Sequence, residues 1–298
     1  MTRKEFEVLA YLERAVRKPS QRAIASGAGV SVGTVNKTVA ALCAREWITA
    51  DLRLTEAGYQ ALEPYRAKRV IILAAGLGSR LLPITLNTPK PLIRVHGRRI
   101  IDTAIDAAIA AGIEEIVIVR GYLPEQFDQL LAKYPQVRFL ENPAYNETNN
   151  ISSAMCARDL FRNAYVMEAD LIINNPAVIR KYNYTSNCLG VPVEKTDDWC
   201  LTSHNGIATG LALGGTDCHH LFSVYYWNAE DGGKLSGHLE EVYRSPGGKE
   251  RFWDLAPLQY FRKEYQVEII ECNMEDITEI DTLRELTGVD KAYGLFGS

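Results

Sequence analysis

Apolar residues recur at helical spacing near the start of the chain. The segment RKEFEVLAYLERAV alternates between an apolar and a polar helical face, which predicts an amphipathic helix. The pattern of residues 20–48 predicts a helix, a turn at residues 27–29 and a second helix. Ser31 precedes the second helix and has a side chain suited to capping it. The apolar face of the first helix consists of Phe6, Leu9, Leu12 and Val16.

The second helix is predicted to have a core face and an exposed front. Val35, Val39 and Leu42 are expected to face a core. Short strands that form a wing follow, and a closing helix begins after Thr55. The exposed front consists of Thr34, Asn36, Lys37 and Thr38. This order of elements resembles the winged helix-turn-helix domain of small bacterial regulators. The resemblance implies contact with DNA through the front, and a protein-contact or dimerisation module is the alternative.

From residue 69 the pattern changes to short apolar runs that alternate with helical segments. The runs at 70–73, 113–121 and 164–170 contain few polar residues, which predicts buried strands. Strands that alternate with helices predict an α/β fold with a mostly parallel sheet covered on both faces. Beyond residue 190 the segments GIATGLALGG, HLFSVYYWNA and RFWDLAPLQYF predict a β-rich, aromatic insertion over the site.

Charge divides the chain at the point where the pattern changes. The net charge is −4 for the 298 residues, but residues 1–69 carry an excess of five positive charges. We therefore predict a small domain at 1–68 and a larger acidic domain at 69–298. No apolar run is long enough to span a bilayer, and the first residues do not form a secretory signal. The six cysteines are scattered without a CxxC pair, which favours free thiols and a cytoplasmic protein.

The first strand of the larger domain is followed by the glycine loop LAAGLGSR. Glycines in such a loop let backbone N–H groups approach phosphate oxygens. The loop is not a Walker sequence, because no GK[ST] follows, and GxGxxG is absent. On its own, the loop is equally consistent with a simple tight turn.

The longer phrase LAAGLGSRLLPITLNTPKP resembles the signature of the nucleotidyltransferases that activate sugar phosphates and related phosphomonoesters. Within that family the chain resembles bacterial CTP:phosphocholine cytidylyltransferases, through the stretches NPAYNETNNISSAM, MEAD, DDWCL, FWDLAP and ITEIDT. The resemblance implies a Rossmann-like (GT-A-like) nucleotidyltransferase domain that transfers CMP from CTP to phosphocholine and releases pyrophosphate.

The resemblance also implies roles for individual residues. Arg80 would stabilise the leaving pyrophosphate, and Lys90 would reach the attacking phosphate. The nucleotide would lie against Leu73, Ala74, Ala75, Gly76, Gly78, Ser79, Gly121, Tyr122, Asn149 and Asn150. Mg²⁺ would be held by Asp170, Glu279 and Asp281.

The chemistry agrees with these roles. Nucleotidyl transfer needs mainly positioning and neutralisation of phosphate charge, and a phosphate acceptor is already ionised, so no general base is required. Magnesium needs only one or two carboxylates besides phosphate oxygens. Each carboxylate taken alone has another interpretation, however: Asp281 is also a plausible N-cap for the segment TLRELTG.

A cationic acceptor would be held by aromatic faces and a carboxylate. We predict Trp199, Trp253 and Asp254 for this role, although aromatic residues in β-rich segments usually belong to the core. Adjacent aromatics in a regular strand point to opposite faces, so at most one of Tyr226 and Trp227 can face the pocket. The alternatives are 2-aminoethylphosphonate or a sugar 1-phosphate as acceptor, another NTP as donor, or a DNA-binding regulator that senses a ligand. A further alternative is that the small domain serves only assembly, for example of a homodimer.

Overall fold

The computed structural model describes residues 1–296, which form two compact units. The first unit, the head, comprises Met1–Arg66 together with Tyr182–Tyr184. The second unit, the body, comprises Ala67–Lys181 and the chain from Thr185 onward. The return of residues 182–184 to the head is a non-local feature that the sequence pattern does not reveal. In the described part of the chain, no helix has the length and apolar character needed to cross a membrane.

The head is built from helices with side-chain caps and one β-bridge. A short turn joins α2 to α3, and the bridge between Ile48 and Leu54 closes a loop between α3 and α4. Ser31 accepts a hydrogen bond from the N–H of Thr34, and Thr55 caps α4 in the same way, so both predicted N-caps are confirmed. The elements are α1 (Arg3–Arg14), α2 (Gln21–Gly27), α3 (Val32–Ala44), α4 (Glu56–Leu62) and η1 (Glu63–Tyr65).

Two residues of the head, Val16 and Thr38, differ from the prediction in whether their side chains are buried or exposed. Val16 is 98% exposed because α1 ends at Arg14, before the apolar spacing does. Thr38 is buried because it follows Val35 by three residues and precedes Leu42 by four, which places all three on one helical face. The exposed front of α3 is therefore narrower than the sequence predicts.

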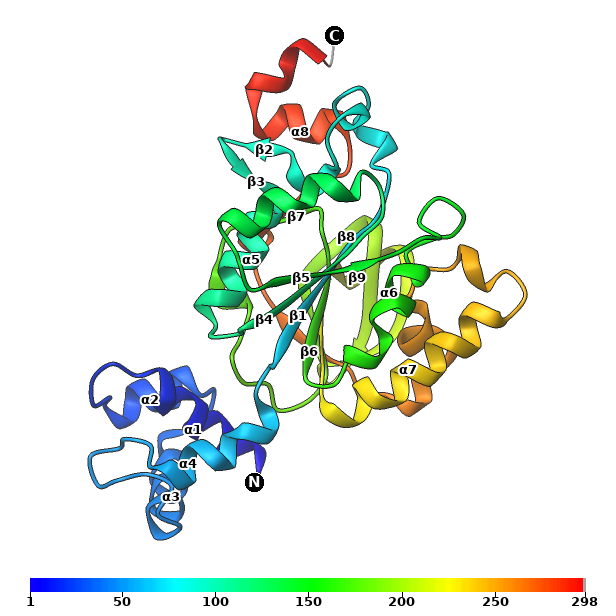
Figure 1. The fold of residues 1–298 in the computed structure, drawn as a ribbon. Helices are drawn as coiled ribbons and strands as arrows, with labels where there is room; N and C mark the ends of the chain where they lie inside the picture. Colours follow the sequence, from blue (N-terminus) through cyan, green and yellow to red (C-terminus); the bar gives the residue numbers. More distant parts are fainter. Residues whose placement is uncertain (297–298) are drawn as a thin grey trace. The chain divides into compact units, whose positions relative to one another are not determined.

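The body contains a seven-stranded sheet in the order β10-β8-β9-β6-β1-β4-β5 (Figure 1). β6, β1, β4 and β5 are parallel, whereas β9 runs antiparallel to both β6 and β8. The prediction of a mostly parallel sheet is confirmed for β6, β1, β4 and β5. The strands are β1 (Arg69–Ala74), β4 (Glu115–Arg120), β5 (Val137–Glu141), β6 (Ala164–Glu168), β8 (Asn187–His204), β9 (Ile207–Trp227) and β10 (Glu268–Glu271).

Helices cover both faces of this sheet, as the apolar strands require. Val70 and Ile72 of β1 pack on the side of α5 and η5, while Ile71 and Leu73 pack on the side of α6 and α7. Figure 1 shows α5 on one face and α6 and α7 on the other. The helices are α5 (Ile100–Ala110), η5 (Pro124–Ala132), α6 (Ile151–Ala157) and α7 (Ala229–Arg244).

The predicted β-rich insertion is the long hairpin of β8 and β9. It contains GIATGLALGG and HLFSVYYWNA, but RFWDLAPLQYF leads into a short π-helix at Ala256–Tyr260, so the prediction of β structure is wrong there. Tyr226 and Trp227 point into the cores on opposite faces of the sheet and are both fully buried. Neither side chain is therefore available to a ligand.

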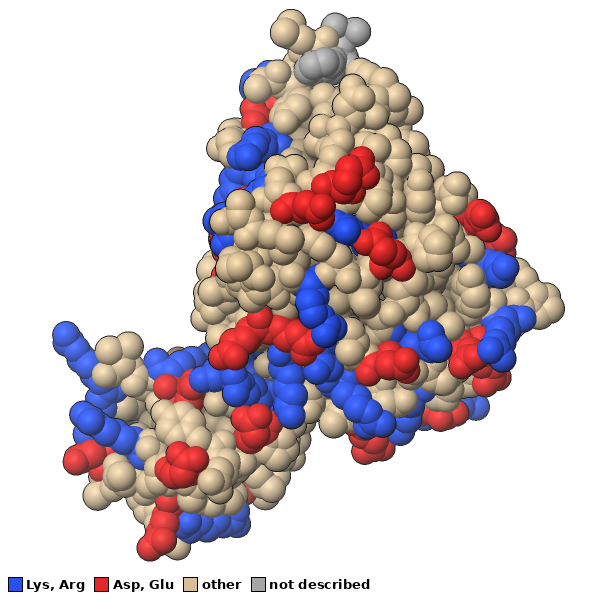
Figure 2. Space-filling view, viewed as in Figure 1, with Lys and Arg blue, Asp and Glu red and all other residues tan. Residues whose placement is uncertain are grey.

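The head presents cations that allow a direct test of the predicted DNA contact. Arg17, Arg22, Lys37 and Arg53 are exposed, and within residues 1–296 none of them forms an ion pair. Lys18 lies against the loop between α3 and α4, with its Nζ 3.0 Å from Asp51. Lys and Arg side chains are visible on the surface of the head, interspersed with Asp and Glu (Figure 2).

We expect the full-length protein to retard a DNA duplex in a low-salt gel, because unpaired cations gain by releasing counter-ions from phosphates. Replacing both Arg22 and Lys37 by Ala should weaken the complex, as should added salt, while Lys133→Ala, in the body, serves as the control because Lys133 already pairs with two carboxylates. Absence of a shift at low salt would contradict DNA binding and favour a protein-contact module.

Candidate active site

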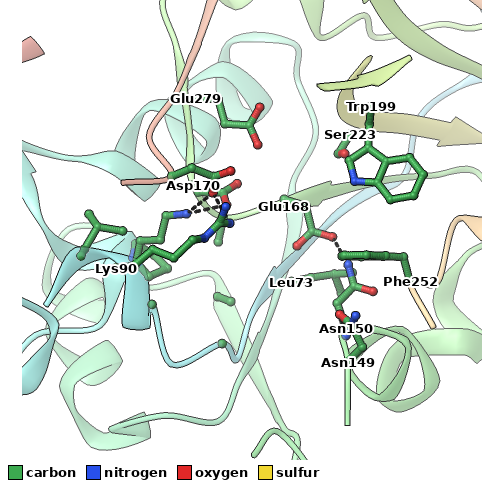
Figure 3. Close-up of a pocket in the computed structure, with 18 of the residues that line it drawn as sticks. Leu73, Lys90, Asn149, Asn150, Glu168, Asp170, Trp199, Ser223, Phe252 and Glu279 are labelled. Carbon is green, nitrogen blue, oxygen red and sulfur yellow. Dashed lines mark hydrogen bonds and ion pairs between the residues drawn. The ribbon is translucent and has the colours of Figure 1, made fainter. Parts of the chain in front are cut away.

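A cavity of about 470 Å³ lies beyond the carboxyl ends of β1 and β6, where ligands bind in sheets of this kind. Figure 3 shows that Lys90 and Asp170 lie at one end, Trp199 and Phe252 at the other, and Glu168 between them. The predicted site residues that line the cavity are Leu73, Ala74, Gly76, Gly78, Ser79, Arg80, Lys90, Asn149, Asn150, Asp170, Trp199, Asp254, Glu279 and Asp281. The predicted residues that do not line it are Ala75, Gly121, Tyr122 and Trp253.

The glycine loop turns sharply after β1. Gly78 has φ +63°, and a Cβ there would lie 3.0 Å from Thr85 Cγ2 and 3.1 Å from Lys90 Cβ. Its carbonyl also accepts a hydrogen bond from Thr85 Oγ1 at 2.9 Å. Gly76 has open space where a Cβ would stand, which leaves its backbone accessible from the cavity. Gly78 therefore lets the loop pack against Lys90, and Gly76 provides the approach for a ligand.

Ala75, Gly121 and Tyr122 support this loop from behind. The N–H of Tyr122 donates to the carbonyl of Ala75 at 3.1 Å, and its hydroxyl donates to the carbonyl of Thr85 at 2.9 Å. Gly121 has no room for a side chain, because a Cβ would lie 2.6 Å from Tyr145. These residues fix the shape of the loop without lining the cavity.

A two-stranded sheet brings together carboxylates that are far apart in sequence. β7 (Leu171–Ile173) pairs antiparallel with β11 (Ile277–Glu279), with Glu279 opposite Leu171. The N–H of Ile280 donates to the carbonyl of Asp170 at 3.1 Å. As a result, oxygen atoms of Asp170, Glu279 and Asp281 all lie within 4.8 Å of one another.

The N-cap role considered for Asp281 belongs to its neighbour. Thr282 caps α8 (Leu283–Val289), and Glu285 completes the capping box. The backbone N–H of Asp281 also donates to Glu285 Oε2. The carboxylate of Asp281 does not cap the helix and faces the cavity instead.

Two cations pair with the carboxylates of Asp170 and Asp281. Lys90 Nζ lies 2.8 Å from Asp170 Oδ2 and 2.9 Å from Asp281 Oδ1. Arg80 reaches the same Oδ1 of Asp281 at 2.7 Å. Burial alone would lower the pKa of Lys90, but the two aspartates outweigh it, so its pKa is raised and the ammonium stays charged.

The third carboxylate, Glu279, is compensated only weakly, by the charge of Lys90. Burial, and then the charges of Asp170 and Asp281, raise its pKa to about 9. Nearby, Oδ1 of Asp170 is buried and has no hydrogen-bond partner in the described chain. An unpartnered carboxylate oxygen beside two further carboxylates is the all-oxygen donor set that suits a hard divalent cation.

The other end of the cavity combines aromatic and acidic side chains. Trp199 and Phe252 form an edge-to-face pair with ring centres 5.5 Å apart. Asp254 is buried and accepts a hydrogen bond from the hydroxyl of Tyr225 at 2.7 Å; burial raises the pKa of Asp254. Asp198 also lines the cavity.

Trp253, which we predicted as an acceptor ligand, belongs to the core instead. It is 1% exposed and packs edge-on against Phe161, Tyr225 and Trp227. In the segment that precedes the π-helix, Phe252 and Asp254 face the cavity, so the residue between them faces away. Phe252 therefore occupies the position expected for Trp253.

Glu168 is a cavity residue that the sequence reasoning missed. Asn150 donates to Glu168 Oε1 at 2.8 Å and also accepts from the backbone N–H of Trp253 at 3.0 Å. Burial, followed by the charges of Asp170 and Asp254, raises the pKa of Glu168 to about 8. The signal was available, because Glu168 precedes Asp170 by two residues at a strand end and side chains two apart share a face.

Comparison with known proteins places this site in a family. A nucleotidyl transferase family model matches residues 69–196. The 2-aminoethylphosphonate cytidylyltransferase of Lancefieldella rimae is 35% identical over 227 residues, which cover 75% of this chain and 92% of that protein. The choline-phosphate cytidylyltransferase of Haemophilus influenzae is 32% identical over 216 residues, with coverage of 72% and 92%. The structure of CTP:phosphocholine cytidylyltransferase from Streptococcus pneumoniae matches with a TM-score of 0.69 and 30% identity, covering 75% of this chain and 98% of that one.

The chain therefore belongs to the nucleotidyltransferase family and is an enzyme of that kind. The three relatives named above all carry cytidylyltransferase names. This result favours the enzyme over the ligand-sensing regulator.

The raised pKa of Glu168 predicts a pH-dependent stability. The unfolded carboxyl ionises near 4.5, whereas the folded one keeps its proton up to about 8. Between these values the folded state binds the extra proton, so Glu168's contribution to the free energy of unfolding falls as the pH rises, by at most about 1.4 kcal/mol per pH unit.

Glu168→Gln removes this titration. We expect urea unfolding to show a smaller loss of stability for the variant than for the wild type between roughly pH 6 and pH 8. Equal losses in the two proteins would contradict a protonated Glu168.

Proposed function

We propose that this enzyme transfers CMP from CTP to the phosphate or phosphonate group of a small molecule that carries an ammonium group, and that it uses Mg²⁺. The observation that supports this most is the single cavity with two chemically different ends. One end has the glycine loop, Arg80 and Lys90; the other has Trp199 and Phe252 beside carboxylates. The named relatives are cytidylyltransferases for 2-aminoethylphosphonate and for choline phosphate, and they support the same reaction.

In this reaction an oxygen of the acceptor attacks the α-phosphorus of CTP, and the bond to the β-phosphate breaks to release pyrophosphate. Arg80 is 64% exposed at the side chain, and it is thus able to follow the triphosphate and neutralise the departing charge. Lys90 is nearly buried, and Pro89 and Pro91 restrict the backbone around it, so it holds the attacking oxyanion in one position. The acceptor oxygen carries no proton to remove.

The carboxylates fit the proposed Mg²⁺. Asp170 and Asp281 would hold it, with Glu279 as the third oxygen donor, because their oxygens converge and Oδ1 of Asp170 has no hydrogen-bond partner among residues 1–296. When bound, Mg²⁺ would offset the negative charge of the phosphates. The residues themselves supply the orientation.

The balance of groups at the acceptor end favours a primary ammonium. Among residues 1–296, the aromatic rings that line that end are those of Trp199 and Phe252, because Trp253 is in the core. Asp254 supplies acceptor oxygens there, and Glu168 lies between the two ends. A primary ammonium has three N–H donors for such oxygens, whereas a quaternary one has none and depends on aromatic faces. We therefore place 2-aminoethylphosphonate first and phosphocholine second as acceptor.

The reaction is tested by pyrophosphate release with Mg²⁺, each NTP, and a panel of 2-aminoethylphosphonate, phosphocholine and sugar 1-phosphates. We expect CTP with an ammonium acceptor to give the highest kcat/KM. Lys90→Met should lower kcat/KM by roughly a hundredfold or more, since a positioned charge is lost. Lys133→Met is a matched control, because Lys133 pairs with two carboxylates outside the cavity. No turnover with any pair would contradict the proposal.

The two acceptors are separated by variants at the acceptor end. Asp254→Asn removes a carboxylate, so it should raise KM for 2-aminoethylphosphonate more than for phosphocholine. Trp199→Leu removes an aromatic face and should have the opposite selectivity, by roughly 1 kcal/mol or fivefold. The measurement is the ratio of the two kcat/KM values in each variant. Unchanged ratios would contradict the assignment of this end of the cavity to the ammonium group.

A further inference from the structure

The carboxylate cluster already contains a cation that belongs to the protein. Lys90 Nζ is in hydrogen-bond contact with oxygens of Asp170 and Asp281, two of the three residues that would hold a divalent ion. We infer that Lys90 is the resting counter-ion of this cluster and that Lys90 and a divalent cation exclude each other there. The nucleotide-free protein then binds divalent ions weakly and takes them up when phosphate oxygens draw Lys90 away.

The exclusion follows from the distances. Mg²⁺ requires carboxylate oxygens at about 2.1 Å. The ammonium of Lys90 stands 2.8 Å from Asp170 Oδ2 and 2.9 Å from Asp281 Oδ1, so it lies in the space between the two carboxylates, while Oδ1 of Asp170 has no hydrogen-bond partner among residues 1–296. Two positive groups in that space would repel each other strongly, because the surroundings are mostly buried.

Lys90 cannot leave this position freely, whereas Arg80 can. The side chain of Lys90 is 11% exposed, and that of Arg80 is 64% exposed. An ammonium that loses its carboxylates inside the protein also loses its compensation for burial. Arg80 instead turns into water. Lys90, rather than Arg80, therefore sets the resistance of the empty site to metal.

A triphosphate removes this resistance. Lys90 and the glycine loop line the same cavity, so phosphate oxygens at the loop give the ammonium new partners without moving it into water. The vacated carboxylates are then available to the cation. Since coupling between two ligands is reciprocal, metal also strengthens nucleotide binding. This part of the inference rests on the proposed function; the weak affinity of the free protein for metal does not.

The test is the binding of Mn²⁺, which serves as a probe for Mg²⁺, to nucleotide-free protein. Binding is measured from the electron paramagnetic resonance signal of the unbound Mn²⁺. We expect Lys90→Met to bind Mn²⁺ at least about tenfold more tightly than the wild type, because a competing positive charge is removed. Lys133→Met should match the wild type. Adding Asp170→Asn to Lys90→Met should abolish the gain, which assigns it to this cluster.

A melting curve provides the second measurement. Lys90→Met leaves Asp170 without its cation and leaves Asp281 with Arg80 alone, so Mn²⁺ should raise the Tm of this variant more than that of the wild type. Lys90→Gln replaces the Met variant if the latter does not fold. Wild-type protein that binds Mn²⁺ as tightly as the Lys90 variants, or with a Kd below about 10 μM, overturns the inference. These readouts need no turnover, so failure of the proposed reaction would be seen separately in the pyrophosphate assay.

Discussion

The ion pairs of Lys90 with Asp170 and Asp281 are the interaction on which the site depends. They join Lys90, which follows the glycine loop, to Asp170 and Asp281. These two residues lie 80 and 191 positions further along the chain, respectively. Without Lys90, three carboxylates would crowd a mostly buried space, and the raised pKa of Glu279 shows how costly the remaining negative charge already is. The same lysine is available to an oxyanion, because phosphate offers it the charge that the aspartates now supply. We therefore propose that one ammonium group serves both for structural compensation and for phosphate binding.

The backbone around this interaction determines where the charges lie. Pairing of β7 with β11 aligns Glu279 with Leu171 and so carries Asp281 to Asp170. Gly78 allows the glycine loop to pack against Lys90, because any Cβ at residue 78 would press on the base of the Lys90 side chain. The cavity therefore forms where two independent backbone features meet at the ends of β1 and β6.

The sequence predicts this half of the site well because its signals are local. The glycine loop and Asp170 follow the ends of β1 and β6, where a parallel sheet places ligands, and the role of Lys90 is predicted from the resemblance of the longer phrase. The acceptor end was less predictable. Whether Phe252 or Trp253 faces the cavity depends on an irregular turn before a π-helix, which has no periodicity to read. The inclusion of residues 182–184 in the head is likewise a long-range packing event without a local signal.

The central claim is that Lys90 alternates between carboxylates and phosphate. A pair of crystal structures, one ligand-free and one with CTP and Mg²⁺, tests it most directly. We expect Lys90 Nζ to contact Asp170 and Asp281 in the first structure, and to contact a phosphate oxygen in the second, with the metal on the two aspartates. A complex in which metal and nucleotide are bound while Lys90 keeps both aspartate contacts would contradict it.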